Sequence, residues 1–205
     1  MNIREEFLNN YLVHLKGALP RSLCEDWVQD YFTRTGINES DPGTIPQDPD
    51  LFSERTRTIT MREASPMTWD AVCELLGGED QIEERTLYFN NSFNLNINNG
   101  GNEVWKGPSS ESPGWHKDGW FFRHFLDSPE QALLTVIQWT DTPPRSGGTF
   151  VACDSFRHIA RYLAEHPEGA EPGACGALID QCEDFIELTG EAGDLTLLHP
   201  FTLHA

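Results

Sequence analysis

Positive charge is scarce in this chain of 205 residues, which carries 14 Lys and Arg side chains against 33 Asp and Glu. The resulting formal net charge of −19 repels phosphate backbones and anionic lipid surfaces, so neither a nucleic-acid nor a membrane partner is expected. The longest apolar run, ALLTVIQW at residues 132–139, is far too short to span a bilayer. The simplest role of the negative charge is to keep the protein soluble.

Paired cysteine motifs are also missing. The number of cysteines is odd, their spacing is irregular, and no Cys-x-x-Cys occurs; they are Cys24, Cys73, Cys153, Cys175 and Cys182. This usage favours reduced thiols over a disulfide framework. The N-terminus, MNIREEFLNN, lacks the basic start and apolar stretch of a signal peptide. Together these features predict a cytoplasmic protein.

The first part of the chain, up to about residue 85, shows mainly helical spacing. A short alternating segment, in which Val13 and Leu15 share one face, precedes a helix expected from about Ser22 to Arg34. Ser22 and Glu25 have the spacing of a capping box. A second, shorter helix is expected over residues 68–76, ended by Gly77 and Gly78.

From about residue 86 onward, short strand patterns alternate with Gly- and Pro-rich turns. The alternation is clearest in TLYFNNSFNLNINN, where Phe93, Leu95 and Ile97 share one face. Further strands are expected in ALLTVIQWTD, TFVAC, DFIELT, DLTLLH and FTLHA, and an amphipathic helix in SFRHIARYLAEH. The pattern predicts one domain over residues 1–205, mainly β with flanking helices. Its helical N-terminal part covers about 1–85 and its jelly-roll or cupin-like β-barrel about 86–205.

The segment PGWHKDGW, residues 113–120, places His116 and Asp118 two positions apart. In a strand these side chains share one face and can chelate a metal, although a surface ion pair has the same pattern. HPFTLH offers His199 and His204 as a third ligand, and the odd spacing would place these two on opposite faces of a single strand. Two histidines and a carboxylate leave positions open for a cosubstrate and O2, as in non-haem Fe(II) oxygenases.

Polar and aromatic residues near these positions have two interpretations each. Asn94, Asn96 and Asn98 either point into the barrel and bind a cosubstrate or substrate, or form a solvated strand face. Lys117 is expected to be solvated on the face opposite His116, and His124 to be structural. Aromatic side chains around the motif either line a substrate pocket or belong to the core; they are Trp115, Trp120, Phe121 and Phe122.

Three segments together resemble the phytanoyl-CoA dioxygenase-like family of Fe(II)/2-oxoglutarate-dependent oxygenases. They are WHKDG, VIQWTDTPPRSGGTFVACDSFRH and GDLTLLHPFTLHA, and the resemblance runs from YLVHLKGALPRSLCEDW to the last residue. It implies a double-stranded β-helix, a jelly-roll variant that agrees with the strand pattern. It also implies Fe(II), 2-oxoglutarate and O2 as cofactors, with ascorbate as a reductant in vitro.

The resemblance assigns roles to individual residues. His116, Asp118 and His204 would be the iron ligands and the catalytic centre, with His199 as a structural neighbour. Trp139 would lie beside 2-oxoglutarate, where Asn96 is a second candidate contact. The implied activity is hydroxylation or oxidative demethylation of a small molecule. Asp118 separates the chain from the family's halogenases, which lack this carboxylate.

One departure concerns the arginine that binds the distal carboxylate of 2-oxoglutarate on the strand after the last histidine. The chain stops at Ala205, so we expect a barrel lacking its last strand. Residues 1–205 would then bind Fe(II) weakly without turning over 2-oxoglutarate; Arg145 is the nearest substitute. The alternatives are an inactive cupin-like barrel that binds a small ligand and a zinc hydrolase, which lacks a nearby HExxH motif. No pattern predicts an oligomeric state.

Overall fold

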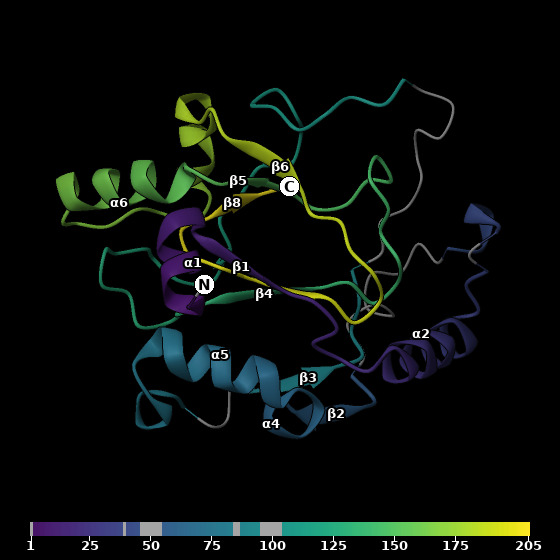
Figure 1. Cartoon of the computed structure of the whole chain (residues 1–205). Helices are drawn as coiled ribbons and strands as arrows, with labels where there is room; N and C mark the ends of the chain where they lie inside the picture. Colours follow the sequence, from purple (N-terminus) through teal and green to yellow (C-terminus); the bar gives the residue numbers. More distant parts are fainter. Residues whose placement is uncertain (1, 39, 46–54, 84–86, 95–103) are drawn as a thin grey trace.

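The structure is a computed structural model that describes residues 2–38, 40–45, 55–83, 87–94 and 104–205 (Figure 1). Its α-helices are α1 (Ile3–Asn10), α2 (Arg21–Thr35), α4 (Met61–Ala64), α5 (Pro66–Leu76) and α6 (Ser155–Glu165). Short 3-10 helices are η1 (Pro42–Thr44), η2 (Glu79–Gln81) and η4 (Ala174–Gln181). The strands are β1 (Leu12–Leu15), β2 (Thr58–Thr60), β3 (Tyr88–Asn90), β4 (Leu134–Ile137), β5 (Phe150–Ala152), β6 (Phe185–Glu187), β7 (Leu195–Leu198) and β8 (Leu203–His204).

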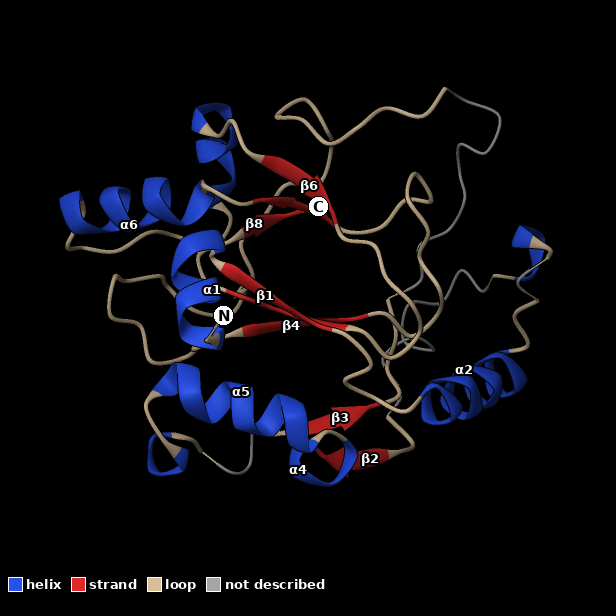
Figure 2. Cartoon of the chain, viewed as in Figure 1, coloured by secondary structure: helices blue, strands red, loops and turns tan. Residues whose placement is uncertain are grey.

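The described strands form three small antiparallel sheets (Figure 2). Their orders are β1-β7-β4, β6-β5-β8 and β2-β3. After β4 the chain crosses to the second sheet for β5 and β6, returns for β7, and crosses again for β8. Helix, at about 34%, exceeds strand, at about 18%. The double-stranded β-helix stays a prediction, because these small sheets neither show nor exclude it.

The buried hydrophobic side chains of the described residues form separate clusters against these sheets. Figure 1 shows the β1-β7-β4 sheet between α5 and the second sheet. The largest cluster joins Val13 and Leu195 of the first sheet to Trp27 and Tyr31 of α2, all buried. Another cluster lies under α6, where Ile159 and Leu163 are fully or almost fully buried, as the amphipathic pattern predicted. Burial of these side chains holds α2 and α6 against the strands.

The expected helices are confirmed, but the capping box is wrong. Helix α2 covers the predicted residues and begins at Arg21, with Pro20 as its N-cap and no side-chain cap hydrogen bond. Ser22 is therefore one residue inside the helix, where its hydroxyl no longer occupies the capping position. Gly77 ends α5 in the left-handed conformation at φ 90°, as expected. No helix in the described ranges is long and apolar enough to cross a membrane.

The long alternating segment 86–99 is only partly described. Strand β3 covers Tyr88–Asn90, Phe93 is buried and Asn94 is exposed. Asn96 and Asn98 lie outside the described residues. Their predicted contact with a cosubstrate or substrate stays a prediction.

Gly193 holds two parts of the fold together just before β7. Its N–H donates to the Gln138 carbonyl at 2.8 Å, and its own carbonyl accepts from the Leu19 N–H at 2.9 Å. Its φ is 100°, and a Cβ added there would collide with the carbonyl oxygen of Leu19. Gly17 also has a left-handed φ, 58°, but nothing lies within 4 Å of an added Cβ. A side chain at Gly17 would thus meet backbone strain alone, whereas one at Gly193 would meet both strain and a steric collision.

We predict that Gly193→Ala lowers the free energy of unfolding by about 3 kcal/mol or more, since it adds a collision to the left-handed strain. Gly17→Ala, the matched control, should cost only about 1–2 kcal/mol, the strain alone. Equilibrium denaturant unfolding of both variants measures the difference. Equal losses would contradict the close approach of Gly193 to Leu19.

Candidate metal centre

His116 and His204, far apart in sequence, lie directly opposite each other in an antiparallel bridge. The N–H of His116 donates to the carbonyl of His204 and the N–H of His204 donates back, both at 3.0 Å. Residues paired in this way project their side chains from the same face. The two imidazole rings accordingly lie with their centroids 4.3 Å apart.

Strand β8 is fixed on its other side by β5. Val151 is paired with His204 and Ala152 with Leu203. Leu203 is completely buried, and its N–H donates to the Ser155 hydroxyl at 2.9 Å. Because successive side chains alternate, burying Leu203 turns His204 to the opposite face.

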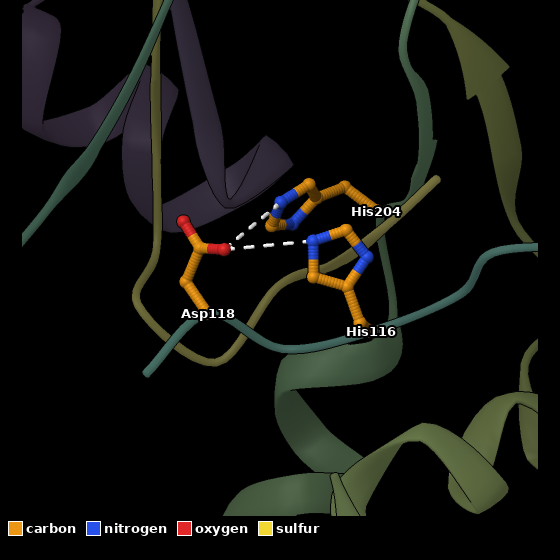
Figure 3. Close-up of side chains that lie close together, drawn as sticks. All are labelled: His116, Asp118 and His204. Carbon is orange, nitrogen blue, oxygen red and sulfur yellow. Dashed lines mark ion pairs between the residues drawn. The ribbon is translucent and has the colours of Figure 1, made fainter. Parts of the chain in front are cut away.

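Asp118 completes the group (Figure 3). Its Oδ1 lies 3.5 Å from His116 Nε2 and 3.6 Å from His204 Nε2. The hydrogen bond with His204 lowers the pKa of the Asp118 carboxyl, and the charges of both histidines add to this against the opposing effect of burial. The carboxylate is therefore ionised and available to a cation. The structure brings together the three side chains that the family resemblance implied as metal ligands.

The Nδ1 atoms of His116 and His204 are hydrogen-bonded to backbone carbonyls. His116 Nδ1 lies 2.8 Å from the Gly114 carbonyl oxygen, and His204 Nδ1 lies 3.2 Å from that of Thr202. A carbonyl only accepts, so each Nδ1 carries a proton. In the neutral ring, the form that can bind a metal, each Nε2 then presents its lone pair. Such second contacts orient histidine ligands in metal sites. Both carbonyls lie two residues before their histidine, a spacing that sequence reasoning had not used.

The donor set fits a divalent transition metal. One ligand atom from each of His116, Asp118 and His204 lies within 4.8 Å of the other two. Their side chains are 31%, 44% and 14% exposed, so a metal held here would remain accessible to small molecules. Imidazole and carboxylate ligands suit Fe(II), Mn(II) or Zn(II).

Lys117 is not solvated, so the expectation for this residue is wrong. It does face away from His116, but that side is covered by the core, and only 3% of the residue is exposed. Its Nζ donates to the Asp118 carbonyl at 3.0 Å, to Gln131 Oε1 at 2.9 Å and to His124 Nδ1 at 3.2 Å. Burial lowers the pKa of the ammonium group. Lys117 thus holds the backbone of the segment from His116 to Asp118, which we call the ligand segment, on the side turned away from the His116 side chain.

Two other histidines have different environments. His124 is buried, and its Nδ1 accepts from Lys117; Nε2 has no hydrogen-bond partner within the described part of the chain. Nδ1 of His199 accepts from the Phe201 N–H at 3.1 Å, and its ring packs with Phe156. Burial, followed by the charge of Lys117, lowers the pKa of His199 to about 4. His199 therefore stays neutral, outside the group formed by the three ligands.

The predicted aromatic positions divide between core and surface. The Trp139 ring packs with Trp27 and Phe93, at centroid distances of 5.5 and 4.8 Å. Trp120 is 64% exposed and stacks with His116 at 6.4 Å, and Phe121 is 87% exposed. Trp120 and Phe121 therefore form an open aromatic surface beside the ligands, whereas Trp139 contributes to the core.

Arg145 lies in the turn before β5. Its backbone N–H donates to Glu187 Oε2 at 2.8 Å, and its guanidinium lies 5.4 Å from the centroid of the Trp105 ring. Its φ of 68° is left-handed, which is uncommon for a residue with a side chain. The alternative in which Arg145 is the substitute cation for 2-oxoglutarate stays untested.

No protein-family model and no curated protein matches this chain. The resemblance to the phytanoyl-CoA dioxygenase-like family therefore stays a prediction, and the argument for function depends on the geometry of the site.

The buried amine of Lys117 generates a stability prediction. Lys117→Ala should lower the free energy of unfolding by about 2–4 kcal/mol, because it leaves Gln131 and the Asp118 carbonyl without this donor and opens a cavity. Lys16→Ala, at an exposed position, is the control and should change stability by less than about 0.5 kcal/mol. Thermal and denaturant unfolding report both values. If Lys117→Ala left the free energy of unfolding unchanged, the hydrogen bonds of the Lys117 amine would contribute nothing to stability.

The ligand group generates a binding prediction. His204→Ala should weaken Mn²⁺ binding by at least about 100-fold, since even outer-shell partners of a metal are worth about 10- to 100-fold. His166→Ala removes a histidine outside the ligand group, whose Nδ1 bonds the Tyr162 carbonyl, and should leave the Mn²⁺ affinity unchanged. Electron paramagnetic resonance of free Mn²⁺ gives the bound fraction. Unchanged binding by His204→Ala would place the metal elsewhere.

Proposed function

We propose that this protein is an Fe(II)/2-oxoglutarate-dependent dioxygenase that hydroxylates, or oxidatively demethylates, a small molecule. The observation that carries the proposal is the convergence of His116 Nε2, His204 Nε2 and an Asp118 oxygen, with both Nδ1 atoms held by carbonyls. When bound, Fe(II) with 2-oxoglutarate supplies the oxidation of a substrate C–H bond by O2, with succinate and CO2 as co-products. Three protein ligands leave room for the cosubstrate.

The residues of the chain have separable tasks in this proposal. His116 and His204 act as neutral ligands, and Asp118 supplies a negative charge that offsets part of the metal's charge. Lys117 positions Asp118 by donating a hydrogen bond to the Asp118 backbone carbonyl, on the face turned away from the metal. The protein's contribution is thus to hold the ion and to keep one side of it accessible.

The strand arrangement supports the same proposal. His116 bridges to β8, so the second sheet continues in the order β6-β5-β8 and then the ligand segment. Strand β7 of the first sheet leads directly into β8 through the turn at Pro200. Crossings between two antiparallel sheets, as from β4 to β5, from β6 to β7 and from β7 to β8, are typical of a jelly-roll variant.

Two further features bear on substrate and location. Trp120 and Phe121 offer exposed aromatic surface beside the ligands, which suits a small molecule with an apolar part. All five cysteines are free, which supports a reducing compartment, and we place the protein in the cytoplasm.

A non-catalytic barrel that binds a small ligand is the second candidate. It is favoured by one observation: the amine of Lys117, the cation next to these side chains in sequence, is buried and donates to the Asp118 carbonyl, Gln131 and His124. That amine is therefore not available to an anionic cosubstrate. An anionic cosubstrate requires a cationic partner when it is buried, so the location of that partner separates the two candidates.

The test measures chelation and turnover separately. Fe²⁺ and 2-oxoglutarate added without oxygen should give a visible metal-to-ligand charge-transfer band, because the keto acid chelates the iron. Admitting air with ascorbate present should then yield succinate from a protein that supplies a cationic partner for the distal carboxylate. Iron bound tightly with no such band would contradict the dioxygenase and favour the ligand-binding barrel.

Asp118→Gly should abolish succinate formation, because the iron loses its anionic ligand. Asp127→Gly, at an exposed position nearby in sequence, is the matched control and should keep normal activity. Product formed at the normal rate by Asp118→Gly would remove this carboxylate from the catalytic group.

A further inference from the structure

A second group of metal-ligating side chains lies at the start of α6. Asp154 directly precedes the helix, and His158 lies one turn later on the same side. Cys182 follows η4 and faces both of them. One ligand atom from each residue lies within 4.8 Å of the other two, and Asp154 Oδ2 is 3.8 Å from His158 Nε2.

The carboxylate of this group is held in place by the backbone. Asp154 Oδ2 accepts from the Glu183 N–H at 3.0 Å, and Oδ1 accepts from the Asp184 N–H at 3.4 Å. The N–H of Cys153, the residue before Asp154, donates to the Asp184 carbonyl at 2.8 Å. A rigid carboxylate at the junction of α6 with the segment leading to β6 is thus already positioned as a ligand.

The thiol of this group is buried beside that carboxylate. Only 6% of Cys182 is exposed, and its Sγ lies 3.7 Å from the Leu178 carbonyl oxygen, to which the thiol donates. Burial and the neighbouring Asp154 raise the pKa of Cys182 to about 12. A divalent cation between the two groups would reverse this preference, because a coordinating thiol loses its proton.

We propose that Asp154, His158 and Cys182 form a binding site for a divalent transition metal, with Zn²⁺ as the expected occupant. Thiolate, imidazole and carboxylate are the three ligand types that zinc uses, and three of them leave one position for water. A surface pocket of about 580 Å³ borders Asp154 and Glu183 and gives solvent a route to the carboxylate. On binding, Cys182 releases its proton to solvent and its sulfur becomes the anionic ligand.

The two sites differ in chemistry. The group of His116, Asp118 and His204 contains only nitrogen and oxygen donors, whereas the second group contains sulfur. Soft thiolate ligands favour Zn²⁺ and Co²⁺, whereas Mn²⁺ prefers oxygen donors. The second site therefore stands independently of the proposed oxygenase activity, and its occupancy can be read by a signal that the first site does not produce.

The test is titration of the reduced, metal-free full chain with Co²⁺. Thiolate bound to Co²⁺ gives a near-ultraviolet charge-transfer band, whose intensity at saturation should correspond to one thiolate-bound ion per chain. Cys182→Ser should lack the band. Cys175→Ser changes another buried cysteine that is outside the group, so it should keep the band.

His158→Gln provides a variant that is less exposed to folding failure, because this side chain is 24% exposed. Losing a ligand should weaken Co²⁺ binding by more than the roughly 10- to 100-fold cost of losing an outer-shell partner. Circular dichroism verifies that each variant is folded. Zn²⁺ should displace Co²⁺ and raise the unfolding temperature of the wild type.

Three results would overturn the site. They are a folded wild type without the band at Co²⁺ in excess over both sites, a band that persists in Cys182→Ser, and unchanged affinity in folded His158→Gln. Loss of the band in Cys175→Ser alone would also overturn it, because the sulfur ligand would then be a different one.

Discussion

The pair of backbone hydrogen bonds between His116 and His204 is the interaction on which the candidate metal centre depends. It joins two segments distant in sequence and sets their register, and register in a sheet decides which face each side chain takes. A slip of one residue would bring Leu203 to the site and bury His204. The pairing of β8 with β5 opposes that slip, because Leu203 already fills the core under α6.

The ligand segment uses its two faces differently. His116 and Asp118 lie on the outer face, where their side chains are partly exposed, and Lys117 lies on the inner face among buried groups. The hydrogen bonds that Lys117 donates offset part of the cost of burying an amine. The same contacts fix the main chain of Asp118, so the geometry of the outer face depends on the packing of the inner one.

Patterns in the sequence predicted the features that depend on near neighbours in the chain, such as helices and the face that a side chain takes. Helical spacing found α2 and α6. Alternation predicted that His116 and Asp118 share a face, and their side chains do converge, but the structure has an isolated bridge at His116 and a bend at Asp118 in place of the expected strand. The burial of Lys117 could not be predicted, because alternation gives the face of a side chain but not what covers that face. The Ser22 capping box failed for a related reason: the motif was present, but the helix began one residue earlier. The choice of His204 over His199 came from a family resemblance, and only the pairing with His116 gives it a physical cause.

We propose that His116, Asp118 and His204 jointly hold a metal through Nε2, carboxylate and Nε2. A crystal structure of the Mn²⁺-loaded protein, with anomalous diffraction recorded at the manganese edge, tests this arrangement directly. We expect an anomalous peak bonded to both Nε2 atoms and to a carboxylate oxygen of Asp118, with both Nδ1 atoms still donating to the carbonyls of Gly114 and Thr202. A peak bonded through Nδ1, or a fully loaded protein with no peak among these three side chains, would contradict it.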